Sequence, residues 1–142
     1  MVKLHGIQPD QLPVYWPFVL PLLEKPFIRL ELFKDYGTDY VLEQVRALKM
    51  QCWIAHENDK ITAVFITQVL DNPNRKVLAI PYVGAESGTI DTWIDAMDTF
   101  KAFAKENGCA VIRGWGRKGW EKVLKPDSVR IEFDIEVQDG QE

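Results

Sequence analysis

The clearest periodic pattern in the chain lies over residues 90–107, where apolar residues recur at steps of three and four. Charged residues occupy the positions between them, which predicts an amphipathic helix. Thr89 can cap its first turn and Gly108 its last. The predicted apolar face consists of Ile90, Trp93, Ile94, Met97, Phe100, Phe103 and Ala104. We expect this face to pack on a sheet and the charged side chains of Asp95 and Lys105 to be exposed.

Four shorter apolar runs predict strands. Residues 53–57 and 60–70 are joined by Asn58-Asp59, a pair suited to a tight hairpin turn. A third run over 76–83 follows a loop rich in Asn and Asp, so these three strands should form an antiparallel meander. After the long helix, residues 109–112 predict a buried strand. A strand, a helix and a further strand in this order favour a right-handed parallel crossover.

The N-terminal region is marked by prolines at every fourth position from Pro9 to Pro21. Proline is tolerated in the first turn of a helix but disrupts a helix interior. We therefore predict an irregular turn over residues 9–16 and a short helix over 17–25, followed by a second helix over 38–50. A proline-rich recognition motif is the alternative, but large apolar residues between the prolines favour a role in the core.

The last part of the chain predicts one more strand. A short helix is expected over residues 119–125, and residues 129–137 then alternate strictly between apolar and charged side chains. The apolar positions are Val129, Ile131, Phe133, Ile135 and Val137, and the charged ones are Arg130, Glu132, Asp134 and Glu136. This period of two predicts a half-buried strand with a charged outer face. Residues 138–142 should fray.

Length and composition fit one globular domain over residues 1–142. Apolar residues make up 46% of the chain and charged residues 27%, which argues against a disordered or repetitive protein. Within this domain we predict a variable N-terminal helical region over 1–37, a core over 38–137 and a frayed tail over 138–142. The apolar stretch over 12–23 is too short to span a bilayer, so neither a membrane nor a targeting segment is expected.

The charge and the few cysteines and histidines narrow the chemistry. The formal net charge is −4, which argues against nucleic acid as a general partner. Cys52 and Cys109 lie in apolar runs and are expected to be free buried thiols, with a single disulfide as the alternative. His5 and His56 are the only histidines, and no zinc-binding spacing occurs. We therefore expect no metal and a cytoplasmic location.

The predicted element order resembles the GNAT superfamily of N-acetyltransferases, and most of all the short GNAT-like proteins encoded by bacteriophages and prophages. Trp53, the helix that carries Trp93, and the stretch from Gly108-Cys109 to Gly119-Trp120 belong to the resemblance, which covers residues 38–137. It implies an α+β fold in α/β/α layers, whose mixed sheet combines an antiparallel meander, a parallel β-α-β crossover and splayed central strands. It also implies the cytoplasm of a bacterial host, or association with the virion.

The resemblance implies acetyl-CoA as the cofactor. In this family acetyl-CoA enters the gap between the splayed strands, and its pantetheine arm pairs with the strand before the long helix, here 76–83. The pyrophosphate lies on backbone N–H groups where that helix begins, because the helix dipole favours anions there. The implied cofactor-binding residues are Val83, Gly84, Ser87, Gly88, Thr89, Arg117 and Lys118.

This sequence departs from the family at several positions. The family's loop pattern is Arg/Gln-x-x-Gly-x-Gly/Ala, but Ala85 stands at its basic or amide position and Ile90 at its last small position. Glu86 and Asp91 add negative charge near the expected pyrophosphate. Leu124 stands where the family often has a tyrosine that protonates the departing thiolate.

The resemblance also implies a base, usually a carboxylate on one of the two strands beside the gap, but residues 77–83 and 109–112 contain none. The nearest ionisable residues are Tyr82, His56 and Glu86, of which Tyr82 and Glu86 are the candidate catalytic residues. Their structural interpretations are a strand aromatic for Tyr82, a hairpin residue for His56 and a solvated loop charge for Glu86. The segment 113–120 holds three cations, two tryptophans and three glycines, a composition suited to ligand contact. The candidate substrate-binding residues are Trp115, Trp120 and His56. A loop anchored by its tryptophans is the alternative for this segment.

The sequence is compatible with two functions. The first is acetyl transfer from acetyl-CoA to an amine of an unknown acceptor, with catalysis mainly by positioning. The second is a catalytically silent GNAT-fold phage accessory or virion-associated protein, which would bind a protein partner or the phage particle. The preserved element order favours the first function, whereas the altered loop and Leu124 favour the second.

Overall fold

The structure is a computed structural model that describes residues 3–86, 90–115 and 124–137, and the side chains of residues 90–93 lie outside this description. A five-stranded sheet forms its centre, in the order β1-β2-β3-β4-β5. The strands are β1 (Lys3–Ile7), β2 (Gln51–Glu57), β3 (Lys60–Asp71), β4 (Lys76–Ala85) and β5 (Cys109–Gly114). The helices are η1 (Pro9–Gln11), α1 (Leu12–Arg29), η2 (Leu32–Lys34), α2 (Thr38–Arg46) and α3 (Ile90–Glu106).

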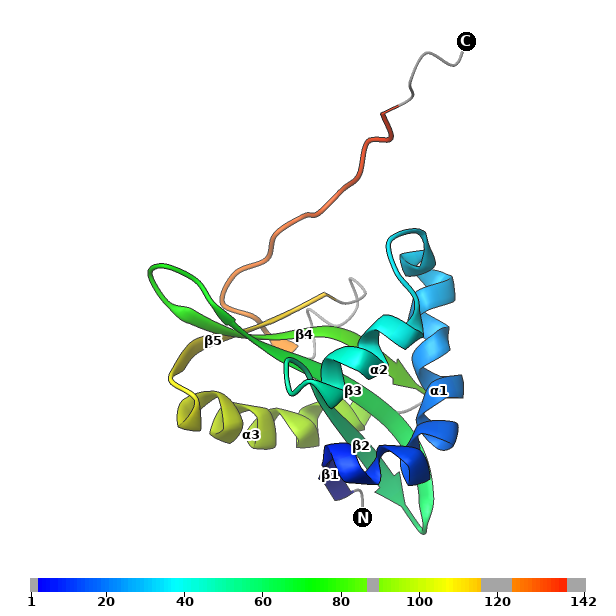
Figure 1. Ribbon diagram of the computed structural model, residues 1–142. Helices are drawn as coiled ribbons and strands as arrows, with labels where there is room; N and C mark the ends of the chain where they lie inside the picture. Colours follow the sequence, from blue (N-terminus) through cyan, green and yellow to red (C-terminus); the bar gives the residue numbers. More distant parts are fainter. Residues whose placement is uncertain (1–2, 87–89, 116–123, 138–142) are drawn as a thin grey trace.

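The topology confirms the predicted α+β fold. Strands β1 to β4 pair antiparallel in chain order, and β5 lies parallel to β4 after the crossover through α3. Helices α1 and α2 cover one face of the sheet and α3 covers the other (Figure 1). The result is three layers with a separate apolar core on each side of the sheet. The first strand, β1, was not predicted, because its five residues lack a clear alternation.

Helix α3 buries the face that its periodicity predicted, with one correction. Phe100 is fully buried, and only 5% of Ala104 is exposed. The rings of Phe100 and Trp53 make a T-shaped contact. Asp95 and Lys105 are exposed, as expected. Ile94 was assigned to the buried face, but 49% of it is exposed, because it lies about 120° around the helix axis from Phe100. Met97 is half-buried, and the side chain of Trp93 lies outside the described residues.

Helix α1 is longer than the sequence suggested. An irregular turn over 9–16 and a short helix over 17–25 were predicted, whereas α1 runs from Leu12 to Arg29 with prolines inside it. Pro17 and Pro21 are exposed, and their four-residue spacing places the missing N–H bonds on one side of the helix. Water can hydrate the carbonyl groups that these prolines leave without helical donors. The prediction was wrong because it treated each proline as a helix breaker by itself.

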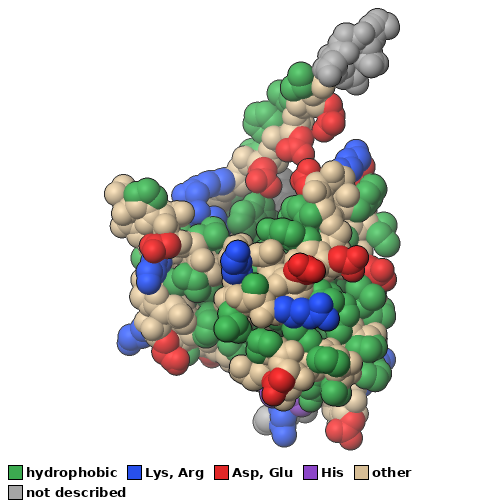
Figure 2. Space-filling view, viewed as in Figure 1, with side chains coloured by type: hydrophobic (Ala, Val, Ile, Leu, Met, Phe, Trp, Pro, Cys, Tyr) green, Lys and Arg blue, Asp and Glu red, His purple; other side chains and the backbone are tan. Residues whose placement is uncertain are grey.

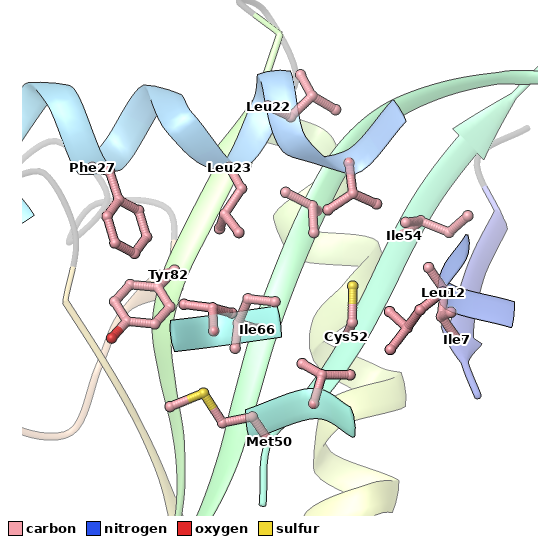
Figure 3. Close-up of a cluster of buried hydrophobic side chains, with 14 residues drawn as sticks. Ile7, Leu12, Leu22, Leu23, Phe27, Met50, Cys52, Ile54, Ile66 and Tyr82 are labelled. Atoms are coloured by element: carbon pink, nitrogen blue, oxygen red, sulfur yellow. The ribbon is translucent and has the colours of Figure 1, made fainter. Parts of the chain in front are cut away.

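The opposite side of α1 forms the larger core. Its buried residues are Leu12, Val19, Leu22, Leu23, Pro26 and Phe27. They meet apolar side chains of the sheet, among them Ile54, Ile66 and Tyr82 (Figure 3). Burial of this apolar stripe stabilises the helix more than the prolines destabilise it, because each fully buried aliphatic side chain contributes about 1.5–3 kcal/mol.

The strand predicted over residues 129–137 does not form. These residues have no sheet partner among the described parts of the chain, and the segment extends away from the body (Figure 1). Its five apolar side chains are all exposed, so the prediction of a half-buried strand was wrong for this chain by itself. The alternating pattern favours a strand, but a strand needs a neighbouring edge, and this segment has none here. The predicted helix over 119–125 lies mostly outside the described residues.

The two cysteines are free thiols in different surroundings. Cys52 is buried in the core beneath α1, and this burial raises the pKa of its thiol to about 12. Cys109 is half-buried at the start of β5. Among the described residues no helix is long and apolar enough to cross a membrane, and no three metal-binding side chains come together.

Thiol labelling should distinguish the two cysteines. At pH 8 we expect Ellman's reagent to modify Cys109 in the native protein while Cys52 stays unmodified until denaturant is added. A thiol with a pKa near 12 is a thiolate in roughly one molecule in ten thousand at pH 8, and only the thiolate reacts. Rapid native labelling of a Cys109→Ser variant would contradict the placement of Cys52.

Candidate functional site

The candidate site is the place where β4 and β5 separate. The two strands pair in parallel from Lys76 and Cys109 as far as Ile80 and Gly114. Strand β4 then continues to Ala85 with only β3 beside it. The pairing therefore ends at Gly114, the last residue of β5, near the position where the strand ends were expected to part. This leaves one edge of β4 without a strand neighbour among the described residues.

A bulge lies where the strands part. The pairing of β3 with β4 shifts between Ile66 and Gln68, so Thr67 faces both Ile80 and Pro81. A bulge bends the strand that carries the additional residue and increases its twist. Pro81 has no N–H group and cannot donate a hydrogen bond to a neighbouring strand. Together the bulge and the proline give a physical reason why β4 leaves β5 at this residue.

Buried polar groups support the bulge from the other side of β3. Thr67 is fully buried, and its hydroxyl accepts a hydrogen bond from Trp53 Nε1 at 2.9 Å. The same hydroxyl donates to Gln51 Oε1 at 2.8 Å. Because both its donor and its acceptor capacity are used, Thr67 is held in one orientation opposite the bulge. The sequence offered no signal for this network.

Beyond the bulge, the backbone groups of Val83 point toward the gap. The Glu86 N–H donates to Thr62 O of β3, at 3.1 Å. Successive peptide groups of a strand alternate sides, so the N–H and C=O of Val83 and Ala85 lie on the edge away from β3. Lys25 Nζ lies 3.4 Å from the Ala85 carbonyl oxygen. Val83 therefore presents both a donor and an acceptor to the side that β5 has left.

Gly84 is the point where α1 comes closest to β4. A Cβ atom built on Gly84 would lie 1.9 Å from the carbonyl oxygen of Leu22. The helical donor to that carbonyl would be residue 26, which is Pro26 and has no N–H group. The Leu22 carbonyl is thus available to face the strand, and Gly84 lets α1 approach it. A glycine that was predicted to contact the cofactor has a packing role on this face of the strand.

Tyr82 lies on the α1 side of β4, where it is buried in the core. It is 4% exposed, and its hydroxyl donates a hydrogen bond to the hydroxyl of Tyr36. Phe27 and Tyr40 extend this aromatic cluster, with ring centroids 5.1 Å from Tyr82 and from Tyr36 respectively. Burial, and then the bond to Tyr36, raise the pKa of Tyr82 above its ordinary value. Tyr82 is therefore neutral near pH 7 and cannot accept a proton as a base.

Glu86 and His56 lie at two other positions near the same end of the sheet. Glu86 follows β4, and its carboxylate oxygen Oε2 lies 3.2 Å from Lys60 Nζ. Because both side chains are solvent-exposed, this pair adds little stability, but it offsets the negative charge of Glu86. His56 is half-buried on β2, with β3 between it and β4. The structure does not bring Tyr82, Glu86 and His56 together.

The other predicted residues are only partly described. Trp115 directly follows β5 and is 40% exposed. Ser87, Gly88, Thr89, Arg117, Lys118 and Trp120 lie outside the described residues. Sequence analysis did not identify two residues that contact β4. Lys25 contacts it from α1, and Tyr36 contacts it from the segment between η2 and α2. Tyr36 is 46 residues from Tyr82 along the chain, so no local pattern connects the two.

Solved structures show which fold this is. A GCN5-related N-acetyltransferase from Ralstonia eutropha JMP134 superimposes with a TM-score of 0.69 at 14% identity, over 96% of this chain and 99% of that one. An aminoglycoside acetyltransferase from an uncultured soil metagenomic sample, in complex with sisomicin, gives 0.68 at 12% identity, with 96% and 97% covered. A predicted acetyltransferase with acetyl-CoA from Clostridium acetobutylicum gives 0.66 at 16% identity, with 96% of each covered.

These likenesses establish the fold of the GNAT acetyltransferases for this chain. No protein-family model and no curated protein matches the sequence. At 12–16% identity the structural agreement reflects the arrangement of helices and strands, which corresponds over nearly the whole of each chain.

Proposed function

We propose that this protein is an N-acetyltransferase that transfers the acetyl group of acetyl-CoA to an amine. One observation carries the proposal: β4 continues past the bulge without β5, and Val83 directs its N–H and C=O into the gap. An extended ligand arm that contains amide groups can pair with such an edge as an added strand would. The pantetheine arm of CoA has this chemistry. The fold shared with an acetyltransferase solved with acetyl-CoA supports the proposal.

The charges around the end of β4 are compatible with an anionic substrate. The negative charge of Glu86 is offset by Lys60 at 3.2 Å. Lys25 adds a second cation beside Ala85. The net effect of these three side chains is one positive charge near the end of β4. Helix α3 begins at Ile90, the next element along the chain after β4, and the start of a helix favours anions through its dipole.

Positioning accounts for most of the proposed chemistry. The amine nitrogen forms the new C–N bond to the acetyl carbon, the C–S bond breaks, and the proton of the amine passes to the solvent or to the released thiolate. Val83 would hold the substrate along β4, and an N–H donor at the gap would polarise the carbonyl. Tyr82 is neutral and hydrogen-bonded to Tyr36, so we assign it a structural role: it forms part of the α1 side of the site.

Val83→Pro tests this proposal because it removes the Val83 N–H, a donor on the edge of β4 that faces the gap. We expect acetyl-CoA to bind about tenfold more weakly, the scale of one lost hydrogen bond, when measured by isothermal titration calorimetry. The substitution leaves the bonds between β3 and β4 in place, since the Val83 N–H points away from β3. Circular dichroism would verify that the variant is folded.

Val83→Thr is the matched control. It keeps the N–H group and the β-branched shape, and it should bind acetyl-CoA as the wild type does. Absence of binding to the wild-type chain at millimolar acetyl-CoA would refute the proposal. That result would favour the alternative of a catalytically silent, phage-encoded accessory or virion-associated protein.

The remaining proposed contacts to the cofactor are Ser87, Gly88, Thr89, Arg117 and Lys118.

A further inference from the structure

Among the described residues, Arg113 is the only Lys or Arg whose side chain is not exposed. It is half-buried near the end of β5, whereas the other lysines and arginines of the described ranges are all exposed. On the face that Figure 2 displays, Lys and Arg side chains lie on the surface beside acidic ones. The acetyl transfer proposed above gives Arg113 no role, so its partial burial needs a reason of its own.

Arg113 lies on the face of the sheet that α1 and α2 cover. The preceding Ile112 packs in the core beneath α3, and successive residues of a strand point to opposite faces. In the register with β4, Arg113 lies beside Ala79 and Gly114 beside Ile80, which is the last pair before the two strands part. Arg113 is therefore at the start of the gap, on the face opposite α3.

No acidic group compensates the charge of Arg113 within the described chain. Over residues 3–86, 90–115 and 124–137 its side chain forms no ion pair and no hydrogen bond. A charged group that is partly removed from water loses hydration energy unless an opposite charge or hydrogen bonds replace it. A guanidinium presents its N–H donors as a planar fork that fits a carboxylate or a phosphate. An acidic group of a ligand would supply this missing partner.

The position of Arg113 suits the acceptor better than the cofactor. The proposed pyrophosphate contacts lie at the start of α3, which covers the opposite face (Figure 1). An arm that begins there and passes through the gap would present its acetyl end to the face of Arg113. Val83 is four residues beyond Ala79 along β4, or about 13 Å away at 3.3 Å per residue. The Arg113 side chain and a small acceptor molecule can together span this distance.

An opposite charge lies beyond the bulge on the same face. Tyr82 points to this face, and Asp35 directly precedes Tyr36, which accepts the hydrogen bond of Tyr82. Burial raises the pKa of Tyr82 most, and the negative charge of Asp35 makes a smaller contribution, so Asp35 lies within electrostatic range of the Tyr82 hydroxyl. This face therefore carries a cation at one end and an anion at the other. An amine that also carries an acidic group has the complementary pair of charges.

We propose that Arg113 binds an acidic group of the acceptor, so that the substrates are amines that also carry a carboxylate or a phosphate. This inference rests on the proposed acetyl transfer and names the class of its acceptor. The guanidinium would hold the acidic group at the end of β5 and leave the amine free to reach the acetyl carbon. The bonds that form and break are those of the acetyl transfer described above.

Arg113→Gln tests this specificity with pairs of acceptors that differ in one acidic group. Release of CoA is measured with glycine and glycinamide, and with O-phosphoethanolamine and ethanolamine. In at least one pair the ratio of kcat/KM, acidic to neutral amine, should fall about tenfold or more in the variant, the scale of one charge-assisted hydrogen bond. The fall should come mainly from a higher KM for the acidic amine. The pair with the larger fall identifies the acidic group as carboxylate or phosphate.

Arg75→Gln is the matched control, since it removes the same charge from an exposed arginine in the turn between β3 and β4. It should keep the wild-type ratios, and calorimetry should give both variants the wild-type affinity for acetyl-CoA. Unchanged ratios in Arg113→Gln would overturn the proposal. A loss of acetyl-CoA binding in Arg113→Gln would also overturn it, because Arg113 would then contact the cofactor.

A binding measurement separates this inference from the proposed function. Millimolar glycine or O-phosphoethanolamine should shift the Nε–Hε resonance of Arg113 in a proton–nitrogen correlation spectrum, whereas glycinamide and ethanolamine should not. A shift without any acetyl transfer would refute the proposed function and keep Arg113 as the binding group for an acidic ligand. Acetyl transfer without a shift would overturn the role of Arg113 and leave the proposed function in place.

Discussion

Replacing Gly84 by alanine should lower the free energy of unfolding by about 3 kcal/mol, the upper end of the range for overpacked sites. The new Cβ would lie 1.9 Å from the Leu22 carbonyl oxygen, closer than any van der Waals contact permits. Because that oxygen belongs to the backbone of α1, no side-chain rotation can relieve the clash. The helix would have to move away from β4 and loosen the core around Leu23 and Phe27. Urea denaturation monitored by circular dichroism measures the effect.

Gly6→Ala is the control for this change. A Cβ on Gly6 would meet the Trp53 ring at 3.4 Å, an ordinary contact distance. In a strand, alanine is favoured over glycine by roughly 0.5–1 kcal/mol, so this variant should be as stable as the wild type or slightly more stable. If Gly84→Ala proves equally harmless, α1 does not rest on β4 as the structure shows.

Phe100→Ala should lower the free energy of unfolding by about 3–5 kcal/mol. Phe100 is fully buried at the centre of the core beneath α3. Its ring makes T-shaped contacts with two neighbours, with centroids 5.4 Å from Trp53 and 5.3 Å from Phe65. Truncation removes both contacts and leaves a cavity between α3 and the sheet. Chemical denaturation gives the loss directly.

Ile94→Ala lies on the same helix and serves as the comparison. About half of Ile94 is exposed, so we expect a change well below that of Phe100→Ala, within about 1 kcal/mol. Similar losses for the two variants would mean that α3 is rotated relative to the sheet. The comparison therefore tests the buried face of α3 independently of the helix propensity of either residue.

The sequence determined those elements whose signal lies within a few neighbouring residues. The steps of three and four over residues 90–107 predicted α3, because a helix turns once in 3.6 residues. The apolar runs predicted β2, β3 and β4, and the order strand–helix–strand predicted that β5 lies parallel to β4. From these elements the resemblance to the GNAT fold followed, and the structure bears it out.

The tertiary structure decided the features that depend on residues distant in the chain. Helix α1 persists through its prolines because one side of it is buried, which no rule for a single proline includes. The bulge opposite Thr67 sets where β4 leaves β5, and Tyr82 meets Tyr36 across 46 residues. The alternation over 129–137 predicted a strand that the structure does not form, because a local pattern does not show whether a sheet edge is available for pairing. Pairing depends on which edge is free and within reach, and that is a property of the folded molecule.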